Sequence, residues 1–103
     1  MIEDIIETIE GVVNEQIPYI LDKYPEESAR CVANIMYESG TIRDTICETI
    51  RWMSLSKEQQ IEICGEYGGD EFGTNAHSVL AEKCYELFDN VEWLYNGCLE
   101  YRD

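Results

Sequence analysis

The chain has 103 residues, of which 22 are Asp or Glu and seven are Lys or Arg, so its formal net charge is −15 at pH 7. A hydrophobic share of 45% excludes a solvated acidic linker, and the length suits a single domain over residues 1–103. Such a charge repels nucleic acid and anionic membrane surfaces, and no apolar run approaches the roughly 20 residues that cross a bilayer.

The first predicted element is an amphipathic helix over residues 2–16, with apolar side chains on one side and acidic ones on the other. Its acidic side carries Glu3, Glu7 and Glu10. Pro18 lacks an amide hydrogen and restricts the residue before it. We therefore expect the helix to stop or kink there, with at most a short helical turn reaching Tyr24.

A second helix is predicted to begin at Pro25, with two glutamates in its first turn, and to end at Gly40, where glycine can adopt a left-handed conformation. Its expected buried residues are Ala29, Val32, Ala33 and Met36. A third helix should follow at once, with a mixture of acids and bases on its exposed face. Its apolar stripe is Ile42, Ile46, Thr49, Ile50 and Met53.

Residues 56–59 have the form of a capping box, which predicts a fourth helix from Lys57 to about Tyr67. Acidic side chains recur every four residues on one side of this helix, at Glu58, Glu62 and Glu66. The apolar arc opposite them consists of Ile61, Ile63, Cys64 and Tyr67. The following residues, 68–75, form a predicted glycine-rich turn.

A long C-terminal helix is predicted from Ala76 to about Tyr101, with Gly97 as its one weak point. Its apolar seam is heptad-like: Leu80, Cys84, Leu87, Val91, Leu94, Cys98 and Tyr101. The seam offers a route to a homodimer, although burial within one chain is the commoner outcome. The predicted fold class is therefore all-α, a compact bundle of about five helices with a long C-terminal helix.

Few residues suggest catalysis. Residues 68–72 spell the GGDEF signature of diguanylate cyclases, but that family needs an α/β domain with the motif in a β-hairpin, and no strand is predicted here. The single histidine, His77, does not match zinc-ligand spacing with Cys64 and Cys84. We therefore expect no enzymatic activity, no metal and no cofactor.

Two aromatic residues, Tyr85 and Trp93, fall by helical phase on the acidic side of the last helix. They are either exposed anchors of an interface or residues covered by another helix, for instance the first. The five cysteines are an odd number and include no CxxC pair, which is typical of thiols in a reducing cytosol. We expect a cytoplasmic location.

The magnitude of the charge favours a nucleic-acid-like surface. A compact domain of this length is roughly 33 Å across, a distance over which duplex DNA carries about 19 charges. Carboxylates on one helix lie about 4.5–6 Å apart along its axis, so several helical faces must combine to match a duplex. The residues predicted to form this surface are Glu3, Glu7, Glu10, Glu58, Glu62, Glu66, Asp70, Glu71, Glu82, Glu86, Asp89, Glu92, Tyr85 and Trp93.

The acidity, the helical pattern and three stretches (residues 17–19, 35–40 and 80–86) resemble the small acidic DNA mimics that bacteriophages make against host defence, in particular the Ocr-like antirestriction proteins. That resemblance implies an elongated dimer in the host cytosol that occupies the DNA groove of a type I restriction enzyme. Anti-CRISPR proteins of the DNA-mimic kind are similar in principle. The chain differs from the Ocr pattern in lacking an acidic C-terminal run and in having five cysteines.

The leading hypothesis is a non-enzymatic inhibitor that blocks the DNA-binding surface of a basic host-defence protein, either a restriction-modification enzyme or a CRISPR-Cas effector. A second hypothesis is a helical adaptor or antitoxin-like module that binds a protein through an apolar groove, with charge serving only solubility. A third is a nucleotide-handling enzyme built around Asp70 and Glu71.

Overall fold

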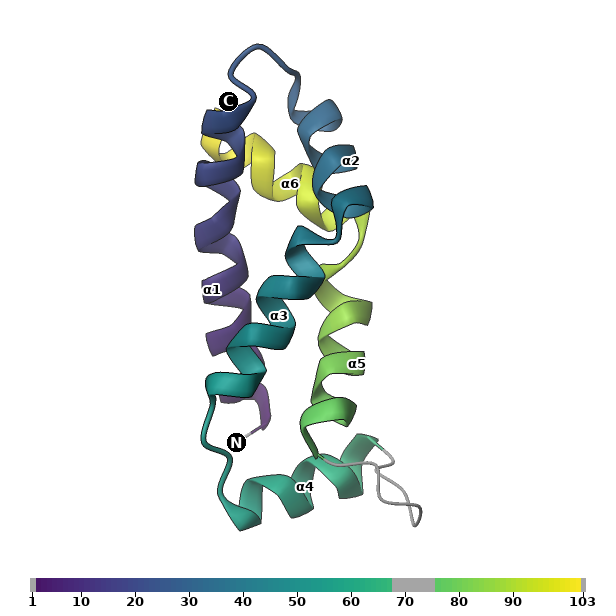
Figure 1. The fold of residues 1–103 in the computed structure, drawn as a ribbon. Coiled ribbons are helices and arrows are strands. Elements are labelled where there is room, and N and C mark those ends of the chain that lie inside the picture. Colours follow the sequence, from purple (N-terminus) through teal and green to yellow (C-terminus); the bar gives the residue numbers. More distant parts are fainter. Residues whose placement is uncertain (1, 68–75, 103) are drawn as a thin grey trace.

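The computed structural model describes residues 2–67 and 76–102, which form helices and connecting turns without strands (Figure 1). The described ranges contain six helices: α1 Ile2–Lys23, α2 Ala29–Ser39, α3 Thr41–Trp52, α4 Lys57–Tyr67, α5 Ala76–Phe88 and α6 Val91–Arg102. The all-α prediction is confirmed, with one helix more than the five expected. Within these ranges, no helix combines the length and apolarity needed to span a membrane.

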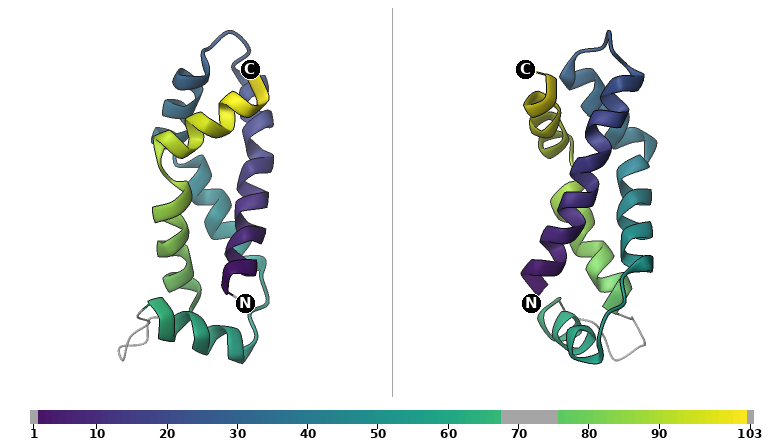
Figure 2. Two further views of the ribbon diagram at one scale, coloured as in Figure 1. Left: turned by 180° about the vertical axis from the view of Figure 1, so that it is seen from behind. Right: turned by 90° about the vertical axis from the view of Figure 1, so that its left-hand side faces the viewer.

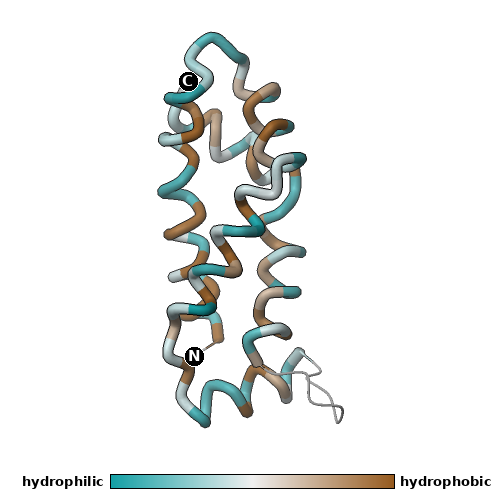
Figure 3. The backbone as a smooth tube through the Cα atoms, viewed as in Figure 1, coloured by the Kyte–Doolittle hydropathy of each residue, from teal (hydrophilic) through white to brown (hydrophobic). Residues whose placement is uncertain are grey.

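The molecule is elongated, measuring 48 × 21 × 18 Å. The helices α1, α3 and α5 run along its length, α4 crosses one end, and α2 packs against α6 at the other (Figures 1 and 2). Hydrophobic and hydrophilic segments alternate along each helix (Figure 3). The core is built from the apolar stripe of every helix, and the buried residues of the described part of the chain are all hydrophobic.

The first helix does not stop at Pro18, as the sequence predicted, but continues to Lys23. Proline inside a helix removes one backbone hydrogen bond, at a cost of about 3 kcal/mol. The residues around it, Ile17, Ile20 and Leu21, are all buried. Burying three large aliphatic side chains contributes more than that cost, at about 1.5–3 kcal/mol for each one, so tertiary packing keeps this segment helical.

The second helix begins at Ala29, four residues later than predicted. Ser28 is the N-cap and accepts a hydrogen bond from the Cys31 amide at 3.2 Å. A hydroxyl oxygen that satisfies a free amide is a stronger start signal than a proline that merely fits the first turn. The end of this helix is confirmed, since Gly40 has φ 75° and joins α2 to α3 without an intervening loop.

The capping box is confirmed at the start of α4. The Ser56 amide donates to Gln59 Oε1 at 2.8 Å, and the Gln59 amide donates to Ser56 Oγ at 3.1 Å. The predicted apolar arc of α4 is only partly buried, because Ile63 is buried while Ile61 is 65% exposed. The helix lies across the end of the bundle, so only one narrow side of it meets the core (Figure 1).

The predicted long C-terminal helix is wrong, because the chain breaks it between Phe88 and Val91. Asn90 caps the new helix: its Oδ1 accepts from the Trp93 amide at 2.7 Å, and its Nδ2 donates to the Leu87 carbonyl at 3.3 Å. The break lets α6 turn aside and pack on α2. The heptad-like seam is therefore discontinuous, and Leu87 within it is exposed.

Candidate partner-binding surface

The acidic stripe of α1 faces away from the core. The buried residues Ile2, Ile5, Ile9 and Val13 occupy the opposite side of this helix. Glu3 and Glu7 are exposed and Glu10 is half-buried. Acidic residues in the first turn also stabilise the helix by interacting with its dipole, which accounts for Glu3 independently of any partner. The whole stripe is accessible to a second molecule.

The acidic stripe of α4 is similarly accessible, with Glu58 and Glu66 exposed and Glu62 half-buried. Its last turn meets the first turn of α1 at Tyr67. Burial raises the pKa of Tyr67 first, and the nearby carboxylates of Glu66 and Glu3 raise it further. Glu3 at the start of α1 and Glu66 at the end of α4 therefore lie near the same ring.

The fifth helix adds Glu82 and Glu86, which are both exposed. Between them, Lys83 lies over the Tyr67 ring, with Nζ 5.3 Å from the ring centroid, and its Nζ is 3.8 Å from Glu86 Oε2. Through its contact with Tyr67, this lysine links α5 to the end of α4. Glu3 of α1, Glu66 of α4 and, through Lys83, Glu86 of α5 thus lie around one residue, and we name this place the Tyr67 junction.

Asp89 does not belong to an accessible surface. Its side chain is only 4% exposed and pairs with Arg43 of α3. This guanidinium also lies over the Tyr85 ring, 4.9 Å from its centroid. The predicted contact of Asp89 with a partner is corrected to an internal contact between α3 and the end of α5.

Glu92 is likewise engaged within the molecule. Its Oε1 lies 2.7 Å from Arg30 Nη1 of α2. Hydrogen bonding to this guanidinium holds the pKa of Glu92 below its usual range, and Arg30 also stacks over the Tyr95 ring at 4.0 Å. The carboxylate joins α6 to α2 while its side chain remains 68% exposed, so a contact of Glu92 with a partner stays a prediction.

The two predicted aromatic anchors are partly covered. Tyr85 hydrogen-bonds Cys47 of α3, and Trp93 packs on Phe88 with ring centroids 5.2 Å apart. Both are half-buried and packed against the core. Of the two alternatives, coverage is the one observed, although the helix that covers Tyr85 is α3 and not α1.

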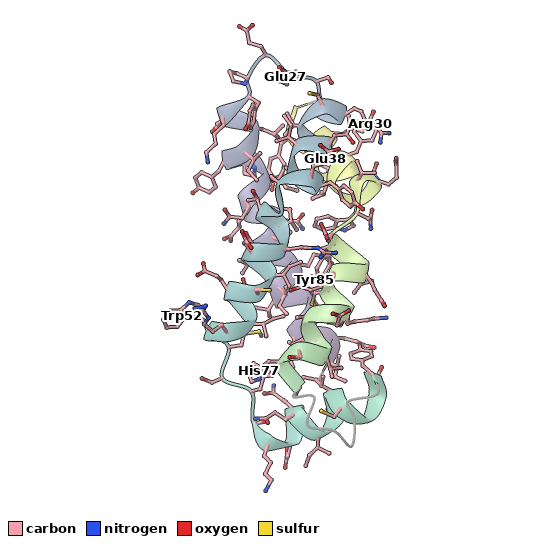
Figure 4. All side chains as sticks on the ribbon, turned by 45° about the vertical axis from the view of Figure 1, so that its right-hand side comes forward. Glu27, Arg30, Glu38, Trp52, His77 and Tyr85 are labelled. Atoms are coloured by element: carbon pink, nitrogen blue, oxygen red, sulfur yellow. The ribbon has the colours of Figure 1, made fainter. Side chains whose placement is uncertain are left out.

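The most exposed aromatic side chain of the described residues is Trp52, which sequence reasoning missed. It is 80% exposed at the end of α3 and points away from the bundle (Figure 4). Its helical phase, outside the buried stripe of Ile42, Ile46 and Ile50, was the available signal. Asp70 and Glu71, and with them the GGDEF stretch, lie outside the described residues.

The elongated shape changes the comparison with DNA. Over 48 Å a duplex carries about 28 charges and one strand about 14, whereas the net charge of the whole chain is −15. The linear charge density is therefore about half that of a duplex and close to that of a single strand. In residues 2–67 and 76–102, no group of three His, Cys, Asp or Glu side chains could hold a metal ion.

Comparison with known proteins adds no relative. The chain matches no protein family, no curated protein and no solved structure.

Proposed function

We propose that this protein is a non-enzymatic inhibitor that occupies the nucleic-acid-binding surface of a basic protein, with carboxylates in place of phosphates. The observation that carries the proposal is the set of accessible acidic stripes on α1, α4 and α5 of an elongated molecule with a net charge of −15. Three members of these stripes, Glu3, Glu66 and Glu86, lie around the Tyr67 junction. The contact residues are Glu3, Glu7, Glu10, Glu58, Glu62, Glu66, Glu82 and Glu86. By its resemblance to phage DNA mimics, the target is a host-defence enzyme such as a restriction-modification or CRISPR-Cas complex.

Each contact between an exposed carboxylate and a basic side chain is weak, so binding would need many of them. An exposed ion pair contributes about 0.2–1 kcal/mol, and salt screens it. Eight carboxylates acting together would supply specific but strongly salt-dependent binding, with fast association. The linear charge density of the chain is close to that of one nucleic-acid strand. We therefore expect a target cleft that binds a single strand, or mainly one strand of a duplex.

The proposal is tested by competition. The chain is immobilised, exposed to a bacterial lysate, and eluted in parallel with single-stranded DNA, duplex DNA or an equal concentration of a neutral polymer. We expect the DNA to release the captured protein at concentrations where the neutral polymer does not, with single-stranded DNA the more effective. A captured protein that stays bound in excess DNA, and still binds its own template, would refute nucleic-acid mimicry.

A charge-matched pair of variants locates the surface. In the first variant, Glu58, Glu62 and Glu66 are all replaced by glutamine. In the control, Glu15→Gln, Asp22→Asn and Glu38→Gln remove the same charge from positions outside the proposed surface. We expect the first variant to lose at least about tenfold in affinity, at roughly 0.5 kcal/mol for each contact, and the control to lose much less. Equal losses would mean that only net charge matters.

The adaptor hypothesis keeps one observation in its favour, the exposure of Trp52 and Ile61 at 80% and 65%. Under that hypothesis these apolar side chains are the contact residues and the glutamates only maintain solubility. Trp52→Ala together with Ile61→Ala would then abolish capture, while the Glu58, Glu62 and Glu66 variant would retain it. Nucleic-acid mimicry predicts the opposite: the glutamate variant weakens capture, and the Trp52 and Ile61 variant retains it.

A further inference from the structure

A pocket of about 510 Å³ lies between α3 and α5, and Glu82 of the proposed acidic surface belongs to its wall. Cys47, Ile50 and Arg51 line it from one face of α3. The α5 wall consists of His77, Ser78, Ala81, Glu82 and Tyr85. Figure 4 shows His77 near the beginning of α5 and Tyr85 farther along it. This volume is within the range of small-molecule sites, about 300–1,000 Å³.

Two opposite charges line this pocket from opposite walls without pairing. Arg51 belongs to α3 and Glu82 to α5, and neither takes part in an ion pair of the described residues. A ligand that carries both a carboxylate and an ammonium group could pair with both. This complementarity points to an amino-acid-like zwitterion.

The thiol of Cys47 lies in the same pocket, four residues before Arg51 on the same helical face. Of the five cysteines, Cys47 is the only exposed one: Cys31 and Cys64 are half-buried, and Cys84 and Cys98 are buried. Burial also raises the pKa of the Cys84 thiol to about 12, which keeps that thiol protonated. Cys47 is therefore the thiol that a ligand in the pocket can reach.

Tyr85 connects Cys47 with the charged wall. Its hydroxyl hydrogen-bonds the Cys47 sulfur, and this contact, followed by burial, raises the pKa of Tyr85 to about 12. The phenol therefore stays protonated at neutral pH and can donate to a thiolate. Glu82 lines the same pocket as Tyr85 and Cys47.

We propose that this pocket binds an amino-acid-derived disulfide of the cystine class and that Cys47 forms a mixed disulfide with it. The ligand carboxylate pairs with Arg51 and its ammonium group with Glu82. The Cys47 thiol loses its proton to solvent, and the thiolate attacks one sulfur of the ligand. The ligand S–S bond breaks as the new S–S bond forms. The departing half leaves as a thiolate and takes a proton from solvent, so the disulfide itself is the only oxidant required.

The test compares two disulfides with no net charge, so that the charge of the chain favours neither. Cystine carries paired charges, whereas bis(2-hydroxyethyl) disulfide carries none. Rates of adduct formation are measured by mass spectrometry, because tryptic cleavage after Arg43 and Arg51 isolates Cys47 in residues 44–51. We expect cystine to modify Cys47 before any other cysteine, and Cys47→Ser to remove this adduct.

The ratio of the rate with cystine to the rate with bis(2-hydroxyethyl) disulfide distinguishes binding of the ligand charges from mere exposure of the Cys47 thiol. We expect Arg51→Gln and Glu82→Gln each to lower the ratio of cystine to hydroxyethyl disulfide by about fivefold, as the loss of one ion pair at an open site would. Glu48→Gln changes the net charge as Glu82→Gln does and lies next to Cys47, but it is outside the pocket lining. This control should leave the ratio unchanged.

Two results would overturn the proposal. One is a rate ratio that neither Arg51→Gln nor Glu82→Gln lowers, which would leave Cys47 as an exposed thiol without a binding site. The other is an adduct that forms first on Cys31 or another cysteine. Unfolding of a variant is recognised separately, because all five thiols would then react with both reagents.

Discussion

At the scale of single residues, Gly97 shows how packing reverses a local preference. Helix propensity favours alanine over glycine by about 1 kcal/mol. A Cβ atom at this position, however, would lie 2.6 Å from Ile17 Cδ1, and Ile17 is fully buried. The absence of a side chain therefore permits α6 to approach α1. Gly97 leaves room for the Ile17 side chain, whereas the sequence suggested only a weak point in a helix.

We predict that Gly97→Ala lowers the free energy of unfolding by about 1 kcal/mol through overpacking. Gly11→Ala, in the interior of α1 where the added Cβ meets no atom beyond the local backbone of its own helix, should instead raise it by about 0.5–1 kcal/mol. Urea denaturation under reducing conditions measures both. Ile17→Val removes the clashing methyl group, so the double variant should be less destabilised than the sum of the single ones. Gly97→Ala that stabilises as much as Gly11→Ala would contradict this account.

At the scale of elements, the break between α5 and α6 determines which helices touch. Asn90 accepts a hydrogen bond from the Trp93 amide in the first turn of α6, and the nearby Asp89 and Glu92 pair with α3 and α2. An uninterrupted helix would carry residues 91–102 past the end of α5 and leave α2 uncovered. Three polar side chains therefore fix the direction of the last helix.

We predict that Asn90→Ala destabilises the protein by about 1 kcal/mol, the usual cost of losing an N-cap. Asn96→Ala provides the control, because Asn96 is exposed in the interior of α6 and alanine is the better helix former there. Thermal denaturation followed by circular dichroism should show a lower midpoint for the first variant only. Equal midpoints for the two variants would show that the cap does not hold the break.

At the scale of the whole molecule, excess charge opposes folding. The described residues contain three ion pairs, and Arg30, Arg43 and Lys83 supply their cations. Most carboxylates thus face solvent with a like charge one helical turn away. The 48 Å length separates the two ends of the molecule by more than a Debye length, about 8 Å at physiological salt, so repulsion acts mainly within each region.

We therefore predict that salt stabilises this protein. The melting temperature should rise between 0.01 and 0.5 M sodium chloride, as the Debye length shortens from about 30 Å to a few ångströms. The variant with glutamine at 58, 62 and 66 should be more stable than the parent at low salt and should gain less from added salt. A melting temperature that falls or stays constant would show that carboxylate repulsion is unimportant for the fold.

Much of the fold could be predicted from local patterns in the sequence. The bounds of α4 and the glycine at the junction of α2 and α3 follow from residues within four positions of one another. The apolar stripes of α2 and α3 are visible in the sequence as a helical period. Helical periodicity and capping act at that range. The exposure of the α1 and α4 carboxylates follows from the same periodicity.

Only the tertiary structure decided the remaining features. Arg43 and Asp89 are 46 positions apart, Arg30 and Glu92 are 62 apart, and no local pattern links them. The continuation of α1 through Pro18 and the coverage of Tyr85 likewise depend on neighbours distant in sequence. The sequence by itself determined that the chain is helical and where its acids project, because those properties arise within one or two turns. Packing between helices decided which acids pair within the molecule and which remain exposed.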